Sequence, residues 1–305
     1  MNKKCLWLIL LVVYVLLCGF LEVSFCTEEK HAKKEKAVDT LLEELKSHRS
    51  LVRSRAVEEI GNRRVEEAVP FLIEALKDPN LPVRYQACLA FTKIKNVNAV
   101  PSLIERLEDR QENWSIQIRA AEALAYIGDI RAYPHLISVL EYECSTLRKT
   151  LKPPIRKSYG SDDEVLELRL TNSLTKLSAS SKETYIPLLL ERIKTTNEMS
   201  KFRYYLAVVL GQLGEEEVVP ILIDYLEKSG EGLVREKCAR ILGDLGDRRA
   251  IEPLKEALQD EFICVSTGDV HKVYGHTVRM AACRSLIKLG VKVENKGKGI
   301  YKVVD

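Results

Sequence analysis

Apolar residues recur along this chain in an eight-residue pattern, in which the first or second residue is usually followed by proline. Val69–Leu76 reads VPFLIEAL, and Val100–Leu107 reads VPSLIERL. Within each copy the apolar side chains lie at i, i+3, i+4 and i+7, which places them on one stripe of a helix. Proline is tolerated there because the first turn of a helix has unpaired N–H groups in any case. Seven copies begin at residues 38, 69, 100, 133, 186, 219 and 251.

A second periodic segment follows each copy and predicts a second helix. Its spacing of 0, 4, 7, 8 and 11 returns from Val83, Ile116, Leu166, Phe202, Val234 and Val278. Glycine or asparagine is expected to end most of these helices, at Gly61, Asn96, Gly128, Gly214, Gly246 and Gly290. One helix pair cannot bury such stripes alone, so the pairs must stack. The pattern therefore predicts an all-α fold, a right-handed α-solenoid of about seven two-helix repeats.

Two repeats carry insertions between their first and second helices. Residues 141–163 separate the helices of repeat four, and residues 261–277 those of repeat seven. The second insertion alternates enough to predict a β-hairpin, and the tail at 291–305 predicts another hairpin that caps the last repeat. Because both insertions interrupt the same turn, we expect both on one edge, where such segments either bind a partner or are tolerated loops.

The predicted organisation is a single elongated repeat domain with an N-terminal leader. The leader covers residues 1–26, a charged linker covers 27–37, the repeats cover 38–290, and the tail follows.

The leader has the features of a secretory signal. Lys3 and Lys4 precede the uncharged run Cys5–Leu21, and Ser24–Cys26 is a candidate small-x-small cleavage site. An uncleaved membrane anchor and a lipidated N-terminus are alternatives, although Phe25 is larger than a lipoprotein signal favours. All three place the repeats outside the cytoplasm, in the periplasm or anchored to the outer face of the inner membrane.

Charge and cysteine content narrow the function classes. The 47 basic and 44 acidic residues give a net charge of +3, too balanced to produce the positive field of a nucleic-acid-binding protein. Five of the eight cysteines follow the leader. Cys88, Cys238 and Cys283 lie in predicted helices and are expected to be buried, whereas Cys144 and Cys264 lie in the insertions and are predicted to be reactive thiols.

The insertions supply the candidate binding residues. The first holds five basic residues within ten positions, which suits an anionic or protein partner. The candidates are Arg148, Lys149, Arg156, Lys157, Tyr159, His271, Tyr274 and His276. Metal binding is not predicted, because the five-residue spacing of the two histidines would place them on opposite faces of a strand. No catalytic motif such as GxSxG or HExxH is present, so neither catalytic residues nor a cofactor are predicted.

One repeat junction carries a family resemblance. Leu242–Leu254 reads LGDLGDRRAIEPL, and Gly128–Ala132 (GDIRA) repeats its centre. These segments resemble the HEAT repeat, in particular the short HEAT-like repeat of phycobilisome lyases. The resemblance covers about residues 38–290. It implies a ladder in which an arginine near the start of each second helix pairs with an aspartate that ends a first helix. The matching residues are Arg84, Arg203, Arg235, Arg279, Asp78, Asp109 and Asp260, while Gln117 and Glu167 depart from the pattern.

The prediction for function is an exported scaffold that binds a protein or peptide partner without catalysis of its own. The partner would lie in the groove lined by the second helices, with help from the insertions. Resemblance to the lyases implies an alternative, a protein that handles bilins or other tetrapyrroles, although those proteins work in a cytosolic compartment. A structural envelope component that associates with itself is the third possibility.

Overall fold

The computed structural model describes residues 38–145, 162–267, 272–297 and 299–304. The chain divides into two compact parts, Met1–Ser102 and Leu103–Asp305, and each is described by itself. The leader, the linker and most of the first insertion lie outside the described residues.

The first part contains two repeats. A helix at residues 38–44 precedes α2 (Ser50–Arg63), and after a 3-10 turn at Glu66–Ala68 the second pair is α3 (Val69–Ala75) and α4 (Leu81–Ile94). The second helices, α2 and α4, pack along each other. Their contact is close because Gly61 faces Ala90, and a Cβ at residue 61 would lie 2.7 Å from that of Ala90.

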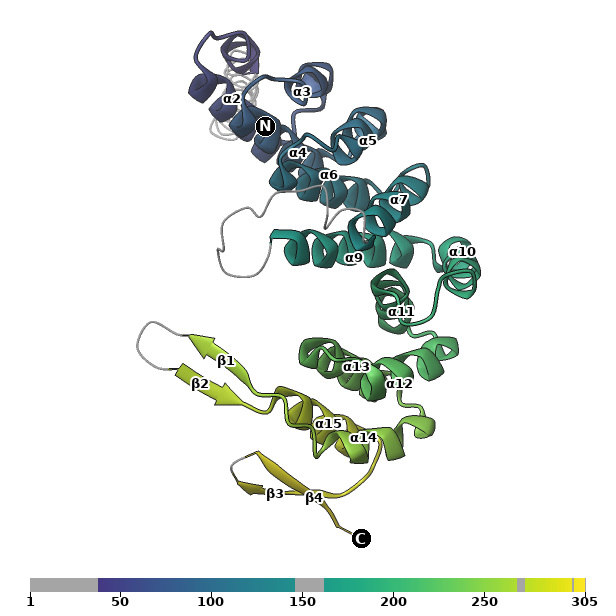
Figure 1. The fold of residues 1–305 in the computed structure, drawn as a ribbon. Helices are drawn as coiled ribbons and strands as arrows, with labels where there is room; N and C mark the ends of the chain where they lie inside the picture. Colours follow the sequence, from purple (N-terminus) through teal and green to yellow (C-terminus); the bar gives the residue numbers. More distant parts are fainter. Residues whose placement is uncertain (1–37, 146–161, 268–271, 298, 305) are drawn as a thin grey trace, which may run out of the picture. The chain divides into compact units, whose positions relative to one another are not determined.

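The second part continues the same alternation (Figure 1). Its first helices are α5 (Val100–Glu108, which begins at the end of the first part), α7 (Ala132–Cys144), α10 (Lys182–Lys194), α12 (Val219–Lys228) and α14 (Ile251–Ala257). Its second helices are α6 (Trp114–Ile127), α9 (Asp162–Ser180), α11 (Lys201–Leu213), α13 (Gly232–Leu245) and α15 (Thr277–Lys288). These second helices pack against one another in chain order, and the first helices lie beside them. The α-solenoid of HEAT-like helix pairs predicted from the sequence is confirmed.

The core follows the periodic positions of the second helices. Ile116, Ala120 and Leu124 of α6 have no exposed surface, and neither do Leu166 and Leu170 of α9. Each such side chain is covered by the neighbouring repeats, because a two-helix unit has no interior of its own. The prediction that Cys88, Cys238 and Cys283 are buried is confirmed as well.

Two predicted helix ends were wrong, and packing explains one of them. Helix α2 continues through Gly61 to Arg63 and is capped by the left-handed residue Arg64, while α4 ends at Ile94 and is capped by Lys95, one residue before Asn96. Gly61 is required inside the helix for the contact with α4, so it does not serve as a cap. At the other sites the prediction is confirmed, because Gly128, Gly214, Gly246 and Gly290 have positive φ values.

Both predicted hairpins are present. Strands β1 (Cys264–Thr267) and β2 (Lys272–Gly275) pair antiparallel between α14 and α15. Strands β3 (Val293–Gly297) and β4 (Ile300–Val303) pair with a bulge at Asn295/Gly297 and contact α15, which caps the last repeat as predicted.

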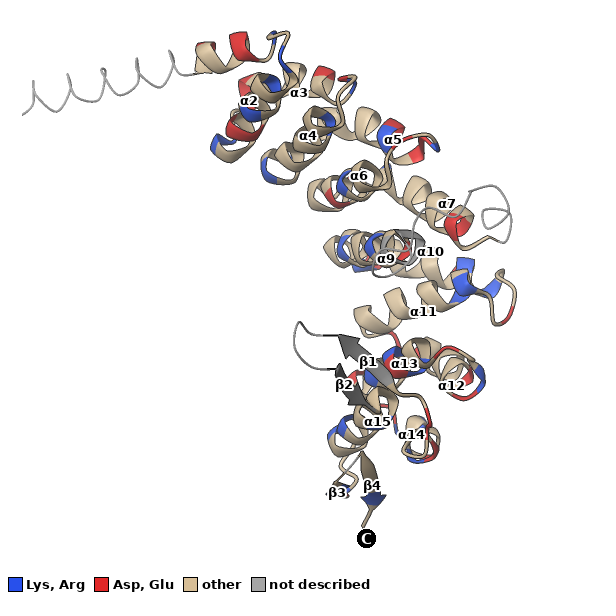
Figure 2. Cartoon of the chain, turned by 60° about the vertical axis from the view of Figure 1, so that its left-hand side comes forward, with Lys and Arg blue, Asp and Glu red and all other residues tan. Residues whose placement is uncertain are grey.

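The surface carries both signs of charge throughout. Basic and acidic residues are interspersed along the helices (Figure 2). Across the described ranges, the structure contains no helix long and apolar enough to span a bilayer.

Gly243→Ala is expected to destabilise the protein by about 1–3 kcal/mol, although alanine is the better helix former. A Cβ at residue 243 would lie 2.7 Å from the backbone Cα of Ser285, so α13 and α15 would have to separate. Thermal unfolding measures the effect. The control is Gly230→Ala, a site outside the helices with no atom within 4 Å, which should leave the melting temperature unchanged. Equal melting temperatures for the two variants would contradict the close-packing argument.

Candidate functional site

In each part of the chain, the turns that join first helices to second helices lie on one edge, and we name it the turn edge of that part. In a regular repeat this edge is closed by a charged pair. Arg53 of α2 bonds the Asp78 carboxylate after α3, with Nε–Oδ2 at 2.7 Å and Nη2–Oδ1 at 2.9 Å. Arg235 of α13 bonds Asp260 after α14 in the same way, at 2.6 and 3.1 Å. In each case a second helix is tied to the next first helix, 25 residues along the chain. We call this arrangement a ladder pair.

The same arginines also close their own turns. Arg53 Nη1 donates to the carbonyl of Ser47, and Arg235 Nη1 donates to that of Ser229, both at 2.7 Å. One guanidinium group therefore satisfies main-chain groups within its own repeat and a carboxylate in the next. The planar fork of arginine makes this dual role possible, and lysine would not reproduce it.

Ionisation of the aspartates is coupled to these contacts. Burial by itself raises the pKa of Asp260, but hydrogen bonds from Arg235 and from the Phe262 N–H outweigh it, so the pKa lies below its usual value. The pKa of Asp78 is lowered in the same way, with burial opposed by hydrogen bonds from Arg53 and Asn80. Both carboxylates therefore stabilise the fold in their charged form.

The pattern changes in the third and fourth repeats. Gln117 of α6 and Glu167 of α9 stand where the regular repeats have arginine, and Tyr142 stands at the position of the aspartate. Gln117 Nε2 keeps the contact with its own turn, since it donates to the carbonyls of Leu107 and Asp109 at 3.3 and 3.0 Å. A glutamine amide cannot also neutralise a carboxylate, so the charged pair is lost here.

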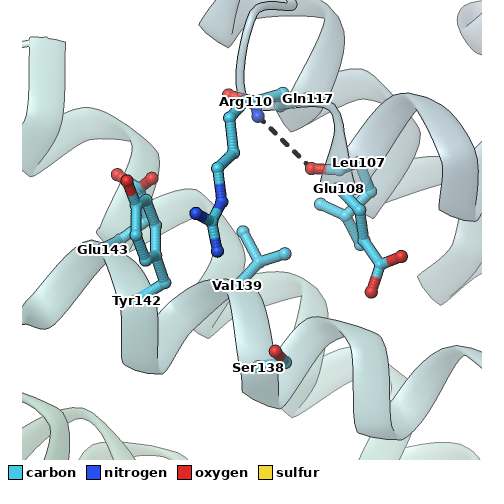
Figure 3. Close-up of a pocket in the computed structure, with 8 residues that line it drawn as sticks. All are labelled: Leu107, Glu108, Arg110, Gln117, Ser138, Val139, Tyr142 and Glu143. Atoms are coloured by element: carbon cyan, nitrogen blue, oxygen red, sulfur yellow. Dashed lines mark hydrogen bonds between the residues drawn. The ribbon is translucent and has the colours of Figure 1, made fainter. Parts of the chain in front are cut away.

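A pocket of about 330 Å³ opens where this pair is missing (Figure 3). It lies between the end of α5, the start of α6 and the C-terminal half of α7. The lining residues are Leu107, Glu108, Arg110, Gln117, Ser138, Val139, Tyr142 and Glu143. The Arg110 guanidinium points into it with its Cζ 4.2 Å from the centroid of the Tyr142 ring, and the Glu143 side chain is buried in its wall. Aromatic, arginine and carboxylate groups in one pocket suit the recognition of polar side chains.

A second pocket, of about 260 Å³, lies on the other side of the C-terminal end of α7. Glu141, Cys144 and Ser145 line it from α7, and Arg192, Ser200 and Phe202 line it from α10 and α11, with Thr195, Thr196 and Asn197 of the turn between them. Arg192 forms an ion pair with Glu141 at its mouth. The end of α7 thus separates two pockets on the turn edge.

A buried charged cluster lies beside this second pocket. The Glu167 carboxylate, only 2% exposed, pairs with Lys201 and accepts a hydrogen bond from the Tyr205 hydroxyl at 3.1 Å. Burial opposes the charge on Lys201, but the contact with Glu167 outweighs it and raises the pKa of the ammonium group. In a regular ladder pair the second helix carries the arginine. Here α9 carries a carboxylate, Glu167, at that position, and the cation that pairs with it, Lys201, lies on α11.

Cys144 is a poor nucleophile in this setting. Burial raises the pKa of its thiol, and the nearby Glu167 carboxylate adds to that shift. Because the thiolate is the reactive form, the structure argues against the prediction of a reactive thiol at Cys144. The side chain of Cys264 lies outside the described residues.

The structure places few of the predicted binding residues. Arg148, Lys149, Arg156, Lys157, Tyr159 and His271 lie outside the described residues, as does the side chain of Tyr274. His276 is described, and it lies at the N-terminal cap of α15 rather than on a strand. Its ring packs against Gly299 of the C-terminal hairpin, since a Cβ there would approach the ring to 2.5 Å. Among the described residues, no group of three His, Cys, Asp or Glu side chains is placed to hold a metal.

The predicted ladder residues divide into several kinds. Arg235 and Asp260 form a ladder pair, and the partner of Asp78 is Arg53, which the sequence analysis missed. Arg84 donates to the carbonyls of Asp78 and Pro79, at 2.7 and 3.1 Å. Arg53 was not predicted because the first copy of the repeat matches the pattern poorly. Its spacing of 25 residues to Asp78, the same as that of Arg235 to Asp260, could have identified it.

The remaining ladder residues have other contacts. Arg279 donates to the carbonyl of Asp260 at 2.5 Å and to that of Gly299, in the C-terminal hairpin, at 3.4 Å. Asp109 Oδ2 lies 3.5 Å from Arg106, and its carbonyl holds Gln117. Arg203 was predicted to belong to the ladder, but its side chain forms no hydrogen bond or ion pair with any residue in the described ranges.

Comparison with known proteins identifies the repeats. The family of HEAT repeats matches residues 38–113 and 186–262, and the PBS lyase HEAT-like repeat matches residues 116–142. None of the curated proteins compared with the chain matches it.

Solved structures show only distant likeness. The complex of CpcE and CpcF of phycocyanin lyase from Nostoc sp. PCC7120 is 23% identical, with 82% of this chain and 87% of that one covered and a TM-score of 0.42. Human deoxyhypusine hydroxylase is 18% identical, covering 86% and 98%, with a TM-score of 0.32. Kap121p is 16% identical, covering 82% and 30%, with a TM-score of 0.44.

Asp260→Asn is expected to cost about 3 kcal/mol of stability at neutral pH, because it leaves the Arg235 guanidinium buried without its counter-charge. Since the pKa of Asp260 is lowered in the fold, its contribution is present above the normal carboxyl pKa, about 4. It is lost as the pH falls through the lowered value. Denaturant unfolding from pH 3 to pH 8 should therefore show the native protein and the variant converging in acid.

The matched control for this prediction is Asp224→Asn, which removes an exposed pair with Lys228. Its expected cost is at most about 1 kcal/mol. A difference between native protein and Asp260→Asn that stayed constant down to pH 3 would show that the carboxylate is not stabilised by its charge.

Proposed function

Because this chain belongs to the HEAT-repeat family, whose stacked helix pairs present extended surfaces, we propose that it is an exported scaffold that binds a protein or peptide partner without catalysis of its own. The observation that carries the proposal is the pair of pockets on either side of the end of α7. They occur where the regular ladder pair is replaced by Gln117, Tyr142 and Glu167.

The chemistry of the pockets favours a peptide or protein surface as the ligand. Tyr142 and Arg110 are residue types enriched in the energetically dominant parts of protein interfaces. Glu108 and Glu141 supply acceptors, and Arg192 supplies a donor, at the mouths of the pockets. A partner can therefore be held by a few side chains inserted along the turn edge. The first insertion, residues 141–163, begins within the end of α7 on this edge, and we propose that its basic residues extend the contact.

Tyr142→Ala is expected to weaken capture of the partner by about tenfold or more, because it removes an aromatic anchor together with the stacking surface for Arg110. The measurement is affinity capture from the native cell envelope with quantitative mass spectrometry. Arg110→Glu, an exposed charge reversal, should have the same effect without altering the core.

The control for capture is Arg248→Glu, an equally exposed charge reversal at a junction between repeats, away from the turn edge. This variant should retain the partner. The proposal fails if no partner is enriched stoichiometrically, or if the same proteins are captured by the native chain, Tyr142→Ala and Arg110→Glu alike. Enrichment of the chain itself as the main partner would instead support a structural envelope component.

Export is the second element of the proposal, and its support is the leader. Two lysines, an uncharged run and a small-x-small site precede the repeats in the order of a secretory signal. The mass of the protein isolated from its host is expected to correspond to a chain beginning at Thr27, recovered from the periplasm or the membrane fraction. A full-length, unmodified chain in the cytosolic fraction would contradict export.

A second candidate function, the handling of bilins or other tetrapyrroles, has one specific observation in its favour. The PBS lyase HEAT-like repeat matches residues 116–142, a segment that contributes four of the eight residues lining the first pocket. An absorbance spectrum of protein purified from its native host separates the two candidates. A visible chromophore at stoichiometric level would support the second candidate and overturn the scaffold.

A further inference from the structure

Arg203 occupies the ladder position of α11, but the chain has no aspartate at the position of its ladder partner. Arg53 and Arg235 each bond an aspartate 25 residues further along the chain. The residue 25 positions after Arg203 is Lys228, at the end of α12. A lysine ammonium group has no acceptor to offer a guanidinium group, so repeats five and six have the cation of a ladder pair without its anion.

The surroundings of Arg203 do not compensate for this loss. The residue is half-buried, and its Nε is fully buried with no acceptor within reach in the described part of the chain. The carbonyl of Ser200, in its own turn, instead accepts a hydrogen bond from the Tyr225 hydroxyl at 2.7 Å. Burial raises the pKa of Tyr225 to about 12, and the charge of Arg203 partly opposes that rise.

Carboxylates in the neighbourhood are engaged elsewhere. Asp224 bonds Lys228 at 2.5 Å on the exposed face of α12, and Glu198 and Glu227 act on the same ammonium group. Arg203 therefore keeps a full positive charge and unused N–H donors at a site where its equivalents are satisfied. The unpaired buried Nε costs free energy, and the Nη groups, which are not among the buried unpaired atoms, are the donors that a ligand can reach.

The ligand chemistry follows from the regular pairs. At Arg53 and Arg235 the guanidinium fork takes the two oxygens of one carboxylate. Position adds a further argument, because Ser200 and Phe202, next to Arg203, line the second pocket of the turn edge.

We propose that Arg203 binds a carboxylate from an acidic segment of the partner protein, which takes the place of the aspartate that the chain lacks at residue 228. The inference rests on the proposed scaffold function and names the chemistry of the partner. An aspartate or glutamate side chain of the partner completes the ladder between repeats five and six. The bound partner therefore stiffens these repeats as well as occupying the edge.

The first test supplies the missing carboxylate from within the chain. Lys228→Asp should form an internal ladder pair with Arg203 and raise the melting temperature by about 3 °C. The regular pairs tolerate an acidic residue one turn earlier, since Glu256 precedes Asp260 and Asp224 would likewise precede the new aspartate. Lys194→Asp is the matched control, because Lys194 is also the last residue of an exposed first helix, α10, and should lower the melting temperature slightly.

The second test measures binding to the full-length protein with a fluorescein-labelled octaglutamate peptide. Lys228→Asp and Arg203→Met should weaken binding at least about tenfold, the loss expected for one charge-assisted contact, while Lys194→Asp should change it less than about threefold. Arg203→Met also keeps the length of the side chain and should not lower the melting temperature, in contrast to Arg235→Met.

Several results would overturn the proposal. One is a Lys228→Asp variant no more stable than Lys194→Asp. Others are octaglutamate binding that is absent in the native protein or unchanged by Arg203→Met. Competition by inorganic phosphate as effective as that by the peptide would reassign the site to phosphate. If the partner is still captured while Arg203 proves irrelevant to acidic peptides, the scaffold function stands and this inference fails. If the acidic peptide binds through Arg203 but no partner is captured, the reverse holds.

Discussion

Burial of the second helices is the constraint on which the rest of this molecule depends. The apolar stripe of each second helix is covered only when the next repeat is in place, and small residues set how closely the helices approach. Gly61 lies against Ala90 and Gly243 against Ser285 at two of these contacts. The buried Ser285 hydroxyl is satisfied by the carbonyl of Ala239 at 2.7 Å, so a polar group in this interface is tolerated. Stability is thus built from nearest-neighbour interfaces, and any polar group at such an interface must find a partner there.

The ladder pairs meet this demand at the turn edge, where first helices end and main-chain carbonyls are left without helical partners. Arg53 and Arg235 satisfy carbonyls of their own repeat and a carboxylate of the next. A buried pair of this kind is a modest source of net stability, because its desolvation offsets much of its attraction. Its loss is costly when one member remains, which is why the departures at Gln117, Glu167 and Arg203 are informative. At Gln117 a neutral side chain keeps the turn closed, and at Glu167 a reversed pair with Lys201 restores neutrality. At Arg203 neither solution is present among the described residues.

Two pockets of the turn edge, both in the second part of the chain, lie at these departures. The regular pair is absent from several consecutive repeats. These repeats contain the two pockets beside α7 and, on α11, Arg203 without a ladder partner. The pocket of about 480 Å³ at repeats six and seven differs, because the ladder pair of Arg235 and Asp260 forms part of its lining. A pocket on this edge therefore does not require the loss of a ladder pair, and what sets the irregular repeats apart is the different set of charged and aromatic side chains that lines their pockets.

The sequence by itself determined the repeat, the helix pairs, both hairpins and the buried cysteines. Each of these follows from local periodicity or from a stripe that only a neighbouring repeat can cover, so no knowledge of distant contacts was needed. The resemblance to HEAT repeats added the ladder, and one of its pairs, Arg235 with Asp260, joins predicted residues. Only the tertiary structure decided which arginines have partners, because this depends on a residue 25 positions away in the next repeat and on the side chains between them. The same reason explains why the pockets were missed. Tyr142, Glu143 and Gln117 are unremarkable in sequence, and they form a site only because stacking brings the ends of three helices together where a charged pair is absent.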